Sequence, residues 1–515
     1  MGVDFFRDIR LRIALISSFC WGIFAHGMNL FNKYAYHDEA VWTVGFVDSE
    51  TFGLGRWGLA VTGSLARLVF GSLHSSSPVF NGLITIFCLA IILYIVCYRL
   101  NIENKVLIVA LSGTLVCFPA ITGIFGFIYT APYYYVGLML AVAGAFIYYG
   151  KKNIYTFLVC VLLMTLSVSI YQANIPVQLM VLLLFMLDEV YGSDMKWCEY
   201  FKTAMENMLI CICFMGLYFV FNFILLRIRG VVMSGYKGAS SFGVTGPLEY
   251  VRRIIDAYKR FIKPADYINN QGVSANMFPW SLKYYHLLLI VLSLVLIVCF
   301  LRSLKNSRKA MQIRIMILLS PLFAYFIYFM VGEDEVHGLM TFGEAFMFFI
   351  PAYIMERSQA SERYLKTLRC CCLGLMFVIG FVSARYANVC YLKADVMQTE
   401  AIGYYNRLIS RIQGAEGYTV ETPVLYVNER SKNDEGFSGN TLFDPIYLPP
   451  YHGNSIINDF SWEETMQLWC GFEPVKADGD SISGSGKEEI QKMPSYPDDG
   501  SIKMIDGTLV VKFAD

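Results

Sequence analysis

The sequence predicts an α-helical protein that crosses a membrane many times and ends in a small α/β module. Of its 515 residues, 56% are hydrophobic and 16% are charged, and the mean hydropathy is +0.49. Soluble domains average about 25% charged residues, so this composition indicates lipid as the main solvent. Long apolar runs recur up to residue 388, and beyond it the composition is that of a soluble domain.

The apolar runs define the first domain, residues 1–388. A helix that crosses the hydrocarbon core of about 30 Å needs about 20 mainly apolar residues. Runs of this kind are centred near residues 22, 88, 114, 140, 163, 181, 218, 293, 322, 348 and 379. We therefore expect about eleven transmembrane helices. The first run, Ile13–Phe31, is long for a signal peptide and lacks a cleavage pattern, which favours a retained first span.

Basic residues predict the orientation of the chain. With a cytoplasmic N-terminus, every short inner loop contains Lys or Arg, as the positive-inside rule requires. These loops are Arg99–Lys105, Lys151–Asn153, Asp188–Glu206, Arg302–Arg314 and Glu356–Arg369. An odd number of spans places the C-terminus outside the cytoplasm.

The second domain, residues 389–515, is predicted to be an extracytoplasmic α/β module. The stretch "TPVLYVNE" is typical of a strand, and "SWEETMQLW" of a helix with Ser461 as its N-cap. The ending "SIKMIDGTLVVKF" predicts a hairpin, because Asp506-Gly507 suits a type I′ turn.

A group of ionisable residues follows the first span directly. The stretch "KYAYHDEAVWTVG" places His37, Asp38 and Glu39 in a row. A partly desolvated aspartate at a membrane surface can act as a general base toward a hydroxyl group. The alternative is an exposed helix cap, with Trp42 and Trp57 as interfacial anchors.

A second acidic segment, "VGEDEVHGLMTFGEAF", is expected on the same outer side. It concentrates acceptor groups in Glu333, Asp334, Glu335, His337 and Glu344. Such oxygens suit a hard divalent ion, although no spacing here defines a metal site. A solvated acidic turn is the alternative interpretation.

The long outer loop 230–283 contains a predicted amphipathic helix, "PLEYVRRIIDAYKRFIK". Apolar residues recur on one face and basic residues on the other, which is typical of a helix in the plane of the membrane interface. The basic face includes Arg252, Arg253, Lys259 and Arg260. These cations could hold the phosphate of a lipid-linked substrate, or they could simply adhere to anionic lipids.

Aromatic and amide side chains mark the outer ends of further spans. Tyr133, Tyr134 and Tyr135 follow Pro132, and Gln172 and Asn174 lie in "SIYQANIP". Most such tyrosines are interfacial anchors. The amides could instead hydrogen-bond the hydroxyl groups of a sugar.

Several classes of function are not favoured. Lys plus Arg and Asp plus Glu both number 41, so net charge indicates no nucleic-acid partner. No nucleotide-binding loop and no Cys/His metal spacing is present in the sequence. We therefore predict no cofactor. Since a lipid-linked phosphate leaving group does not strictly require a divalent ion, we predict no metal either.

These motifs resemble those of the GT-C membrane glycosyltransferases, and more narrowly the bacterial and phage type II glucosyltransferases that decorate O-antigen. The resemblance rests on "YHDEAVW", "GRWG", "APYYYVG" and "SIYQANIP", and on the ending "MPSYPDDGSIKMIDGTLVVKF". It implies a GT-C-like fold in the bacterial inner membrane. It further implies transfer of a hexose, commonly glucose, from a polyprenyl-phosphate donor to a glycan or lipid-linked glycan acceptor at the outer face.

The resemblance also implies roles for individual residues. Asp38 matches the first acidic position of the outer loop and Glu39 the second, where two aspartates are expected. Which carboxylate is catalytic, and whether His37 takes part, stays open; we favour Asp38 as the base. Arg56 and the basic helix would hold the departing phosphate.

Two other classes of protein share parts of this pattern. A lipid-linked glycan polymerase or ligase would rely on arginines rather than on an acidic pair. A transporter or flippase tends to place ionisable groups at the midplane and to show inverted repeats. The spans of this chain are almost free of charge, which argues against transport.

Overall fold

The computed structural model describes residues 7–34, 46–71, 77–235, 246–262, 282–331, 336–358, 363–428 and 462–513. Its internal contacts divide the chain into two compact units. The first comprises Met1–Asn32 and Thr43–Asn388, and the second Lys33–Trp42 and Val389–Asp515. The candidate residues His37, Asp38, Glu39, Glu333 and Asp334 lie outside the described residues.

The first unit is helical. Its α-helices are α1 (Ile9–Phe31), α2 (Ser49–Gly53), α3 (Trp57–Phe70), α4 (Pro78–Arg99), α5 (Lys105–Val116), α6 (Pro119–Phe125), α7 (Ala131–Gly150), α8 (Ile154–Ile170), α9 (Ile175–Gly192), α10 (Trp197–Arg229), α11 (Pro247–Ile262), α13 (Leu282–Ser303), α14 (Ser307–Ala324), α15 (Phe326–Met330) and α16 (Phe349–Arg357). Short 3₁₀ helices are η3 (Gln172–Asn174), η7 (Gly338–Met340) and η8 (Phe342–Phe348). Helix α17 (Arg363–Gln413) begins in this unit and continues into the second.

The described residues contain seven helices long and apolar enough to cross a membrane, or eight if the bent pair α5–α6 is one span. Each of the eleven expected centres falls within or beside a helix, but the expected count is not confirmed. Helix α8 is apolar yet has only 17 residues, and the run near residue 348 divides into η8 and the nine-residue α16. The run centred near residue 181 belongs to α9, the most buried of the candidate spans among the described residues.

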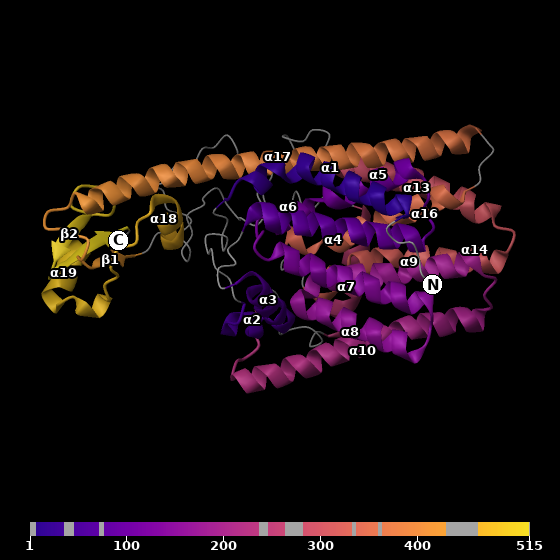
Figure 1. The fold of residues 1–515 in the computed structure, drawn as a ribbon, viewed down its shortest axis with the longest axis horizontal. Helices are drawn as coiled ribbons and strands as arrows, with labels where there is room; N and C mark the ends of the chain where they lie inside the picture. Colours follow the sequence, from indigo (N-terminus) through magenta and orange to yellow (C-terminus); the bar gives the residue numbers. More distant parts are fainter. Residues whose placement is uncertain are drawn as a thin grey trace. The chain divides into compact units, whose positions relative to one another are not determined.

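The helices form a layered bundle. Helix α1 packs on α4 and α5, α4 on α7, α7 on α8, and α8 on α10, an order that can be followed in Figure 1. Glycines allow the close approach of α1 and α4, as small residues do between membrane helices. A Cβ atom at Gly22 would lie 2.6 Å from Ile86, and one at Gly82 would lie 2.0 Å from Leu30.

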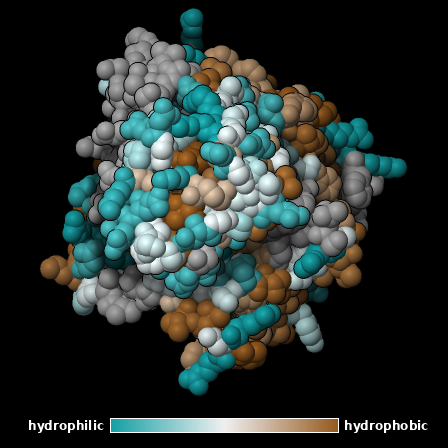
Figure 2. All heavy atoms as spheres, turned by 90° about the vertical axis from the view of Figure 1, so that its left-hand side faces the viewer, coloured by the Kyte–Doolittle hydropathy of each residue, from teal (hydrophilic) through white to brown (hydrophobic). Residues whose placement is uncertain are grey.

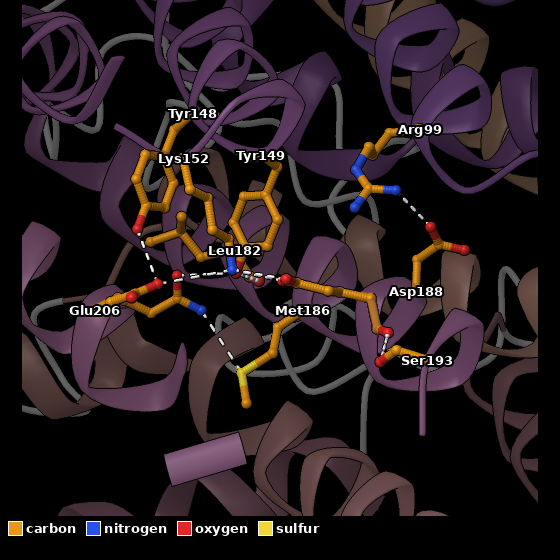
Figure 3. A network of polar contacts seen from close by, with 11 residues as sticks. Arg99, Tyr148, Tyr149, Lys152, Leu182, Met186, Asp188, Ser193 and Glu206 are labelled. Atoms are coloured by element: carbon orange, nitrogen blue, oxygen red, sulfur yellow. Dashed lines mark hydrogen bonds and ion pairs between the residues drawn. The ribbon is translucent and has the colours of Figure 1, made fainter. Parts of the chain in front are cut away.

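The five loops predicted to be cytoplasmic are connected to one another by salt bridges at one end of the bundle. Figure 3 shows part of this polar network, with Arg99 directed at Asp188 and Lys152 lying between acidic side chains. The pairs are Arg99–Asp188, Arg357–Asp188, Lys152–Glu189, Lys152–Glu206 and Arg308–Asp194. Loops that pair with one another lie on the same side of a membrane, which supports their common assignment.

The second unit contains α18 (Trp462–Cys470), η10 (Gly479–Ser481), α19 (Gly484–Lys492) and the strands β1 (Val424–Val427), β2 (Ile502–Ile505) and β3 (Thr508–Lys512). Among its described residues the strands form one sheet in the order β1-β3-β2, with β1 parallel and β2 antiparallel to β3. The face of the molecule drawn in Figure 2 carries many hydrophilic residues, in teal, alongside apolar patches in brown.

The predicted hairpin is confirmed. Asp506 and Gly507 connect β2 to β3 with φ values of 50° and 74°, and positive φ at both residues defines a type I′ turn. The Asp506 carboxylate accepts hydrogen bonds from the backbone and hydroxyl of Ser483 at 3.0 and 2.7 Å. These bonds stabilise the charged form and lower the pKa of Asp506.

Candidate functional site

Arg56 forms the centre of an aromatic cluster at the end of the bundle away from the salt-bridge network. It immediately precedes α3, and its Nη1 donates to the Tyr134 hydroxyl oxygen at 3.3 Å. Its guanidinium lies 5.4 Å from the ring centroid of Tyr171, within range of a cation–π contact. The rings of Tyr134 and Tyr171 stack at 4.1 Å with an interplanar angle of 4°. Tyrosines from two segments distant in the sequence therefore hold the guanidinium of a third segment.

Gln172 fixes the turn that carries Arg56. Its Nε2 donates to the Leu54 carbonyl at 2.7 Å and to the Tyr218 hydroxyl at 3.0 Å, and that hydroxyl donates to the Gly55 carbonyl at 3.1 Å. Gly55 has φ of 72°, and a Cβ there would lie 2.3 Å from the Tyr218 hydroxyl. Only glycine suits this position. The amide nitrogen of Gln172 therefore positions Arg56.

The structure corrects the roles expected for Trp57 and Asn174 at the outer ends of the helices. Trp57 is not an interfacial anchor, because it is buried and its ring packs against Phe221 at 5.6 Å. Asn174 is buried as well, and its Nδ2 donates to the Ser167 hydroxyl at 3.1 Å. Neither residue is exposed to a ligand.

The predicted amphipathic helix is present as α11, with its apolar side outward. Leu248 is 84% exposed and Ile262 60%, whereas Arg253 and Arg260 are buried. An outward apolar stripe on a membrane protein favours contact with lipid. The arginines then face the other helices of the bundle.

The four predicted cations of α11 fall into two pairs. Arg253 donates to the carbonyls of Phe329 and Met330 at 3.1 and 3.4 Å, and Arg260 lies over the ring of Tyr328 at 5.4 Å. Arg252 and Lys259 have side chains that are 72% and 68% exposed. The first pair attaches α11 to the segment around α15, and the second pair is accessible to a ligand.

The segment after the second acidic loop reaches the same region. His337 precedes η7, which packs closely against α6. A Cβ atom at Gly123 of α6 would lie 3.1 Å from the Cβ of Leu339 in η7. The ring of Phe342 contacts that of Tyr135 at 5.3 Å, next in sequence to Tyr134 of the Arg56 cluster. The structure thus brings the His337 segment close to this cluster through α7.

Glu344 does not belong to a solvated acidic turn. It is 5% exposed, and its Oε1 has no hydrogen-bond partner among the described residues. Burying a polar atom without a partner costs about 1–3 kcal/mol, so this position requires an explanation. The acidic composition of the loop did not indicate it.

The residues that lead into the His37–Glu39 motif are well held. Gln398 of α17 donates through Nε2 to the Lys33 carbonyl at 3.0 Å, and Tyr34 is 3% exposed. Burial raises the pKa of the Tyr34 phenol, and the nearby Asp395 carboxylate raises it further. The chain therefore enters the motif from an anchored position with a neutral phenol.

The described residues thus define a helical membrane protein with an arginine–tyrosine–amide cluster at one end of its bundle. The family model for the glucosyl transferase GtrII matches residues 27–350, more than half of the chain. The chain belongs to this glucosyl transferase family, so it is a membrane glycosyltransferase. No curated protein and no solved structure matches it.

Proposed function

We propose that this protein transfers a glucosyl residue from a polyprenyl-phosphate donor to a cell-surface glycan at the outer face of the bacterial cytoplasmic membrane, with Asp38 as the general base. The observation that carries the proposal is the convergence of Tyr134 and Gln172 on Arg56, the residue predicted to hold the departing phosphate. All of them lie within the family match.

The reaction is a displacement at the anomeric carbon. The base removes the proton of the acceptor hydroxyl, the new glycosidic bond forms, and the bond to the phosphate oxygen breaks. The transition state resembles an oxocarbenium ion and leaves a negative charge on the phosphate. Such a site needs one carboxylate near the acceptor and one fixed cation near the leaving group.

Arg56 suits the second role. A guanidinium presents paired N–H donors that match the geometry of a phosphate. Tyr134 and Tyr171 hold it in place, so little side-chain freedom is lost when the donor binds. The exposed Arg252 and Lys259 would attract the lipid phosphate as it approaches along the interface.

The test is a transfer assay with the full chain in proteoliposomes. Labelled glucose would be offered on a polyprenyl monophosphate, and on a nucleotide as the comparison, together with a lipid-linked glycan acceptor. We expect transfer from the monophosphate alone. Transfer of a whole oligosaccharide from a polyprenyl diphosphate would instead identify a polymerase or ligase and refute the proposal.

Substitution of Arg56 tests its assignment. Arg56→Ala should lower the transfer rate about 100-fold, because loss of one fixed charge donor at a developing anion has an effect of this order. Arg56→Lys should recover part of the rate, since a lysine keeps the charge but loses the planar paired donors. Arg67→Ala is the matched control, because Arg67 is an exposed cation near the other end of α3. Equal rates for Arg56→Ala and this control would exclude Arg56 from the site.

A further inference from the structure

A cavity of about 380 Å³ lies between α11, α13, α14 and the segment formed by η8 and α16. Ligand sites have volumes of about 300–1,000 Å³, mostly apolar walls and a few placed polar groups. Leu289, Leu294 and Ile297 of α13 form part of the apolar wall, and His286 and Glu344 belong to the polar lining.

The lining is elongated along the helices. On α13 it extends from His286 to Ile297, eleven residue steps that correspond to about 16 Å at 1.5 Å per residue. On the opposite wall it extends from Ile317 of α14 to Tyr325, directly after that helix, about 12 Å. This length is about half of the hydrocarbon core of about 30 Å. The cavity therefore fits a slender chain that lies along the spans.

Three polar groups of the lining lie at one end of this cavity. His286 lies near the start of α13, Tyr325 directly follows α14, and Glu344 precedes α16. His286 is 7% exposed, and its Nε2, like Oε1 of Glu344, has no hydrogen-bond partner among the described residues. Oγ of Ser293, about 10 Å farther along α13, is a third such atom in the lining. The pair at the polar end indicates a ligand with a polar head.

The polar end adjoins both the cationic helix and the Arg56 cluster. Tyr258 and Phe261 of α11 line the cavity, and the buried Arg260 of the same helix is close enough to Glu344 to interact with it electrostatically. Glu344 is two residues from Phe342, whose ring contacts Tyr135. This end therefore holds a carboxyl group with a cation beside it, which suits a ligand head that carries both a phosphate and hydroxyl groups.

We propose that this cavity binds a single isoprenoid chain of the polyprenyl-phosphate donor, with the phosphate at the polar end. The inference rests on the proposed function and adds where the lipid chain of the donor binds. The imidazole of His286 would donate to a phosphate oxygen, and the Glu344 carboxylate would accept from a sugar hydroxyl. The volume suits one chain, whereas a membrane phospholipid brings two acyl chains.

Photo-crosslinking tests the binding directly. The full chain in proteoliposomes would be irradiated with a polyprenyl phosphate that carries a diazirine in its first isoprene units, and labelled peptides identified by mass spectrometry. We expect label on α13 and α14 in the wild type. Ser293→Phe, which fills the cavity at a lining residue, should reduce this label about tenfold, and the milder Ser293→Leu less. Val295→Phe is the control, because Val295 is 47% exposed on the same helix.

Donor chain length gives a second measurement. Ser293→Phe should raise the KM for a long-chain donor about tenfold, equivalent to about 1.4 kcal/mol, and leave a donor of two isoprene units unaffected. Equal effects on both donors, or stronger labelling by a diacyl phosphate probe, would overturn the cavity assignment. Wild-type protein that is labelled in the cavity but transfers no glucose would refute the proposed function while retaining the lipid site.

Discussion

Asp38→Asn should abolish measurable glucosyl transfer while the protein remains normally abundant in the membrane. A positioned general base contributes about 10²–10⁴-fold to a rate, and asparagine keeps the size of the side chain but cannot accept the proton. The measurement is the rate of transfer from polyprenyl-phosphate glucose in proteoliposomes. Lys33 and Tyr34, which lead into this motif, are held by α17 and by burial, so we expect the substitution to leave the fold intact.

Glu39→Gln is the matched comparison for this experiment. If the motif is helical, adjacent residues point about 100° apart, and we predict that only one carboxylate of the pair serves the acceptor hydroxyl. We expect Glu39→Gln to reduce the rate far less than Asp38→Asn does. The reverse order would transfer the role of base to Glu39, and full activity in both variants would remove the motif from the catalytic site.

Local features of this chain could be predicted because their causes are local. The turn at Asp506-Gly507 follows from the backbone conformations that these residues adopt. Helix α11 follows from the spacing of its apolar and basic residues. In both cases the pattern lies within fewer than twenty residues, so no tertiary information was needed.

The arrangement of the candidate site depended on contacts that no local pattern contains. Arg56 and Gln172 could be singled out from the motifs "GRWG" and "SIYQANIP", but the stacking of Tyr171 on Tyr134 joins two different helical segments. The role of Gln172 as a support for the turn at Gly55 likewise appears only when α10 brings Tyr218 to it. The one available signal was that Tyr171 directly precedes Gln172.

The inward direction of Arg253 and Arg260 could not be predicted for a related reason. An amphipathic pattern indicates two faces but does not say what covers each of them. Here the apolar residues are exposed, and the arginines meet the carbonyls and the ring near α15. Glu344 is similar, because its burial results from η8 packing against neighbouring helices, whereas its neighbours in the sequence are typical of an exposed loop.

Asp188→Ala should destabilise the protein more than any other single change in the polar network shown in Figure 3. The carboxylate is 7% exposed and accepts hydrogen bonds from Arg99, from Arg357 at 3.1 Å and from the Tyr353 hydroxyl at 3.2 Å. Its loss leaves two guanidinium groups facing one another. Removing one partner of a buried ion pair costs about 3–5 kcal/mol, and the partial exposure of both arginines favours the lower value.

The comparison variant is Glu189→Gln, one residue further along the same helix. Glu189 pairs with Lys152 at 2.6 Å, but both side chains are 27% exposed, so its loss should cost less than about 1 kcal/mol. Thermal unfolding in detergent would show a clearly larger decrease in Tm for Asp188→Ala than for Glu189→Gln. The transfer rate per folded molecule should stay unchanged in both, because this network joins the loops at the end of the bundle away from Arg56. Equal Tm values would mean that Asp188 does not hold these loops together, and a selective loss of rate would place the network in the catalytic path.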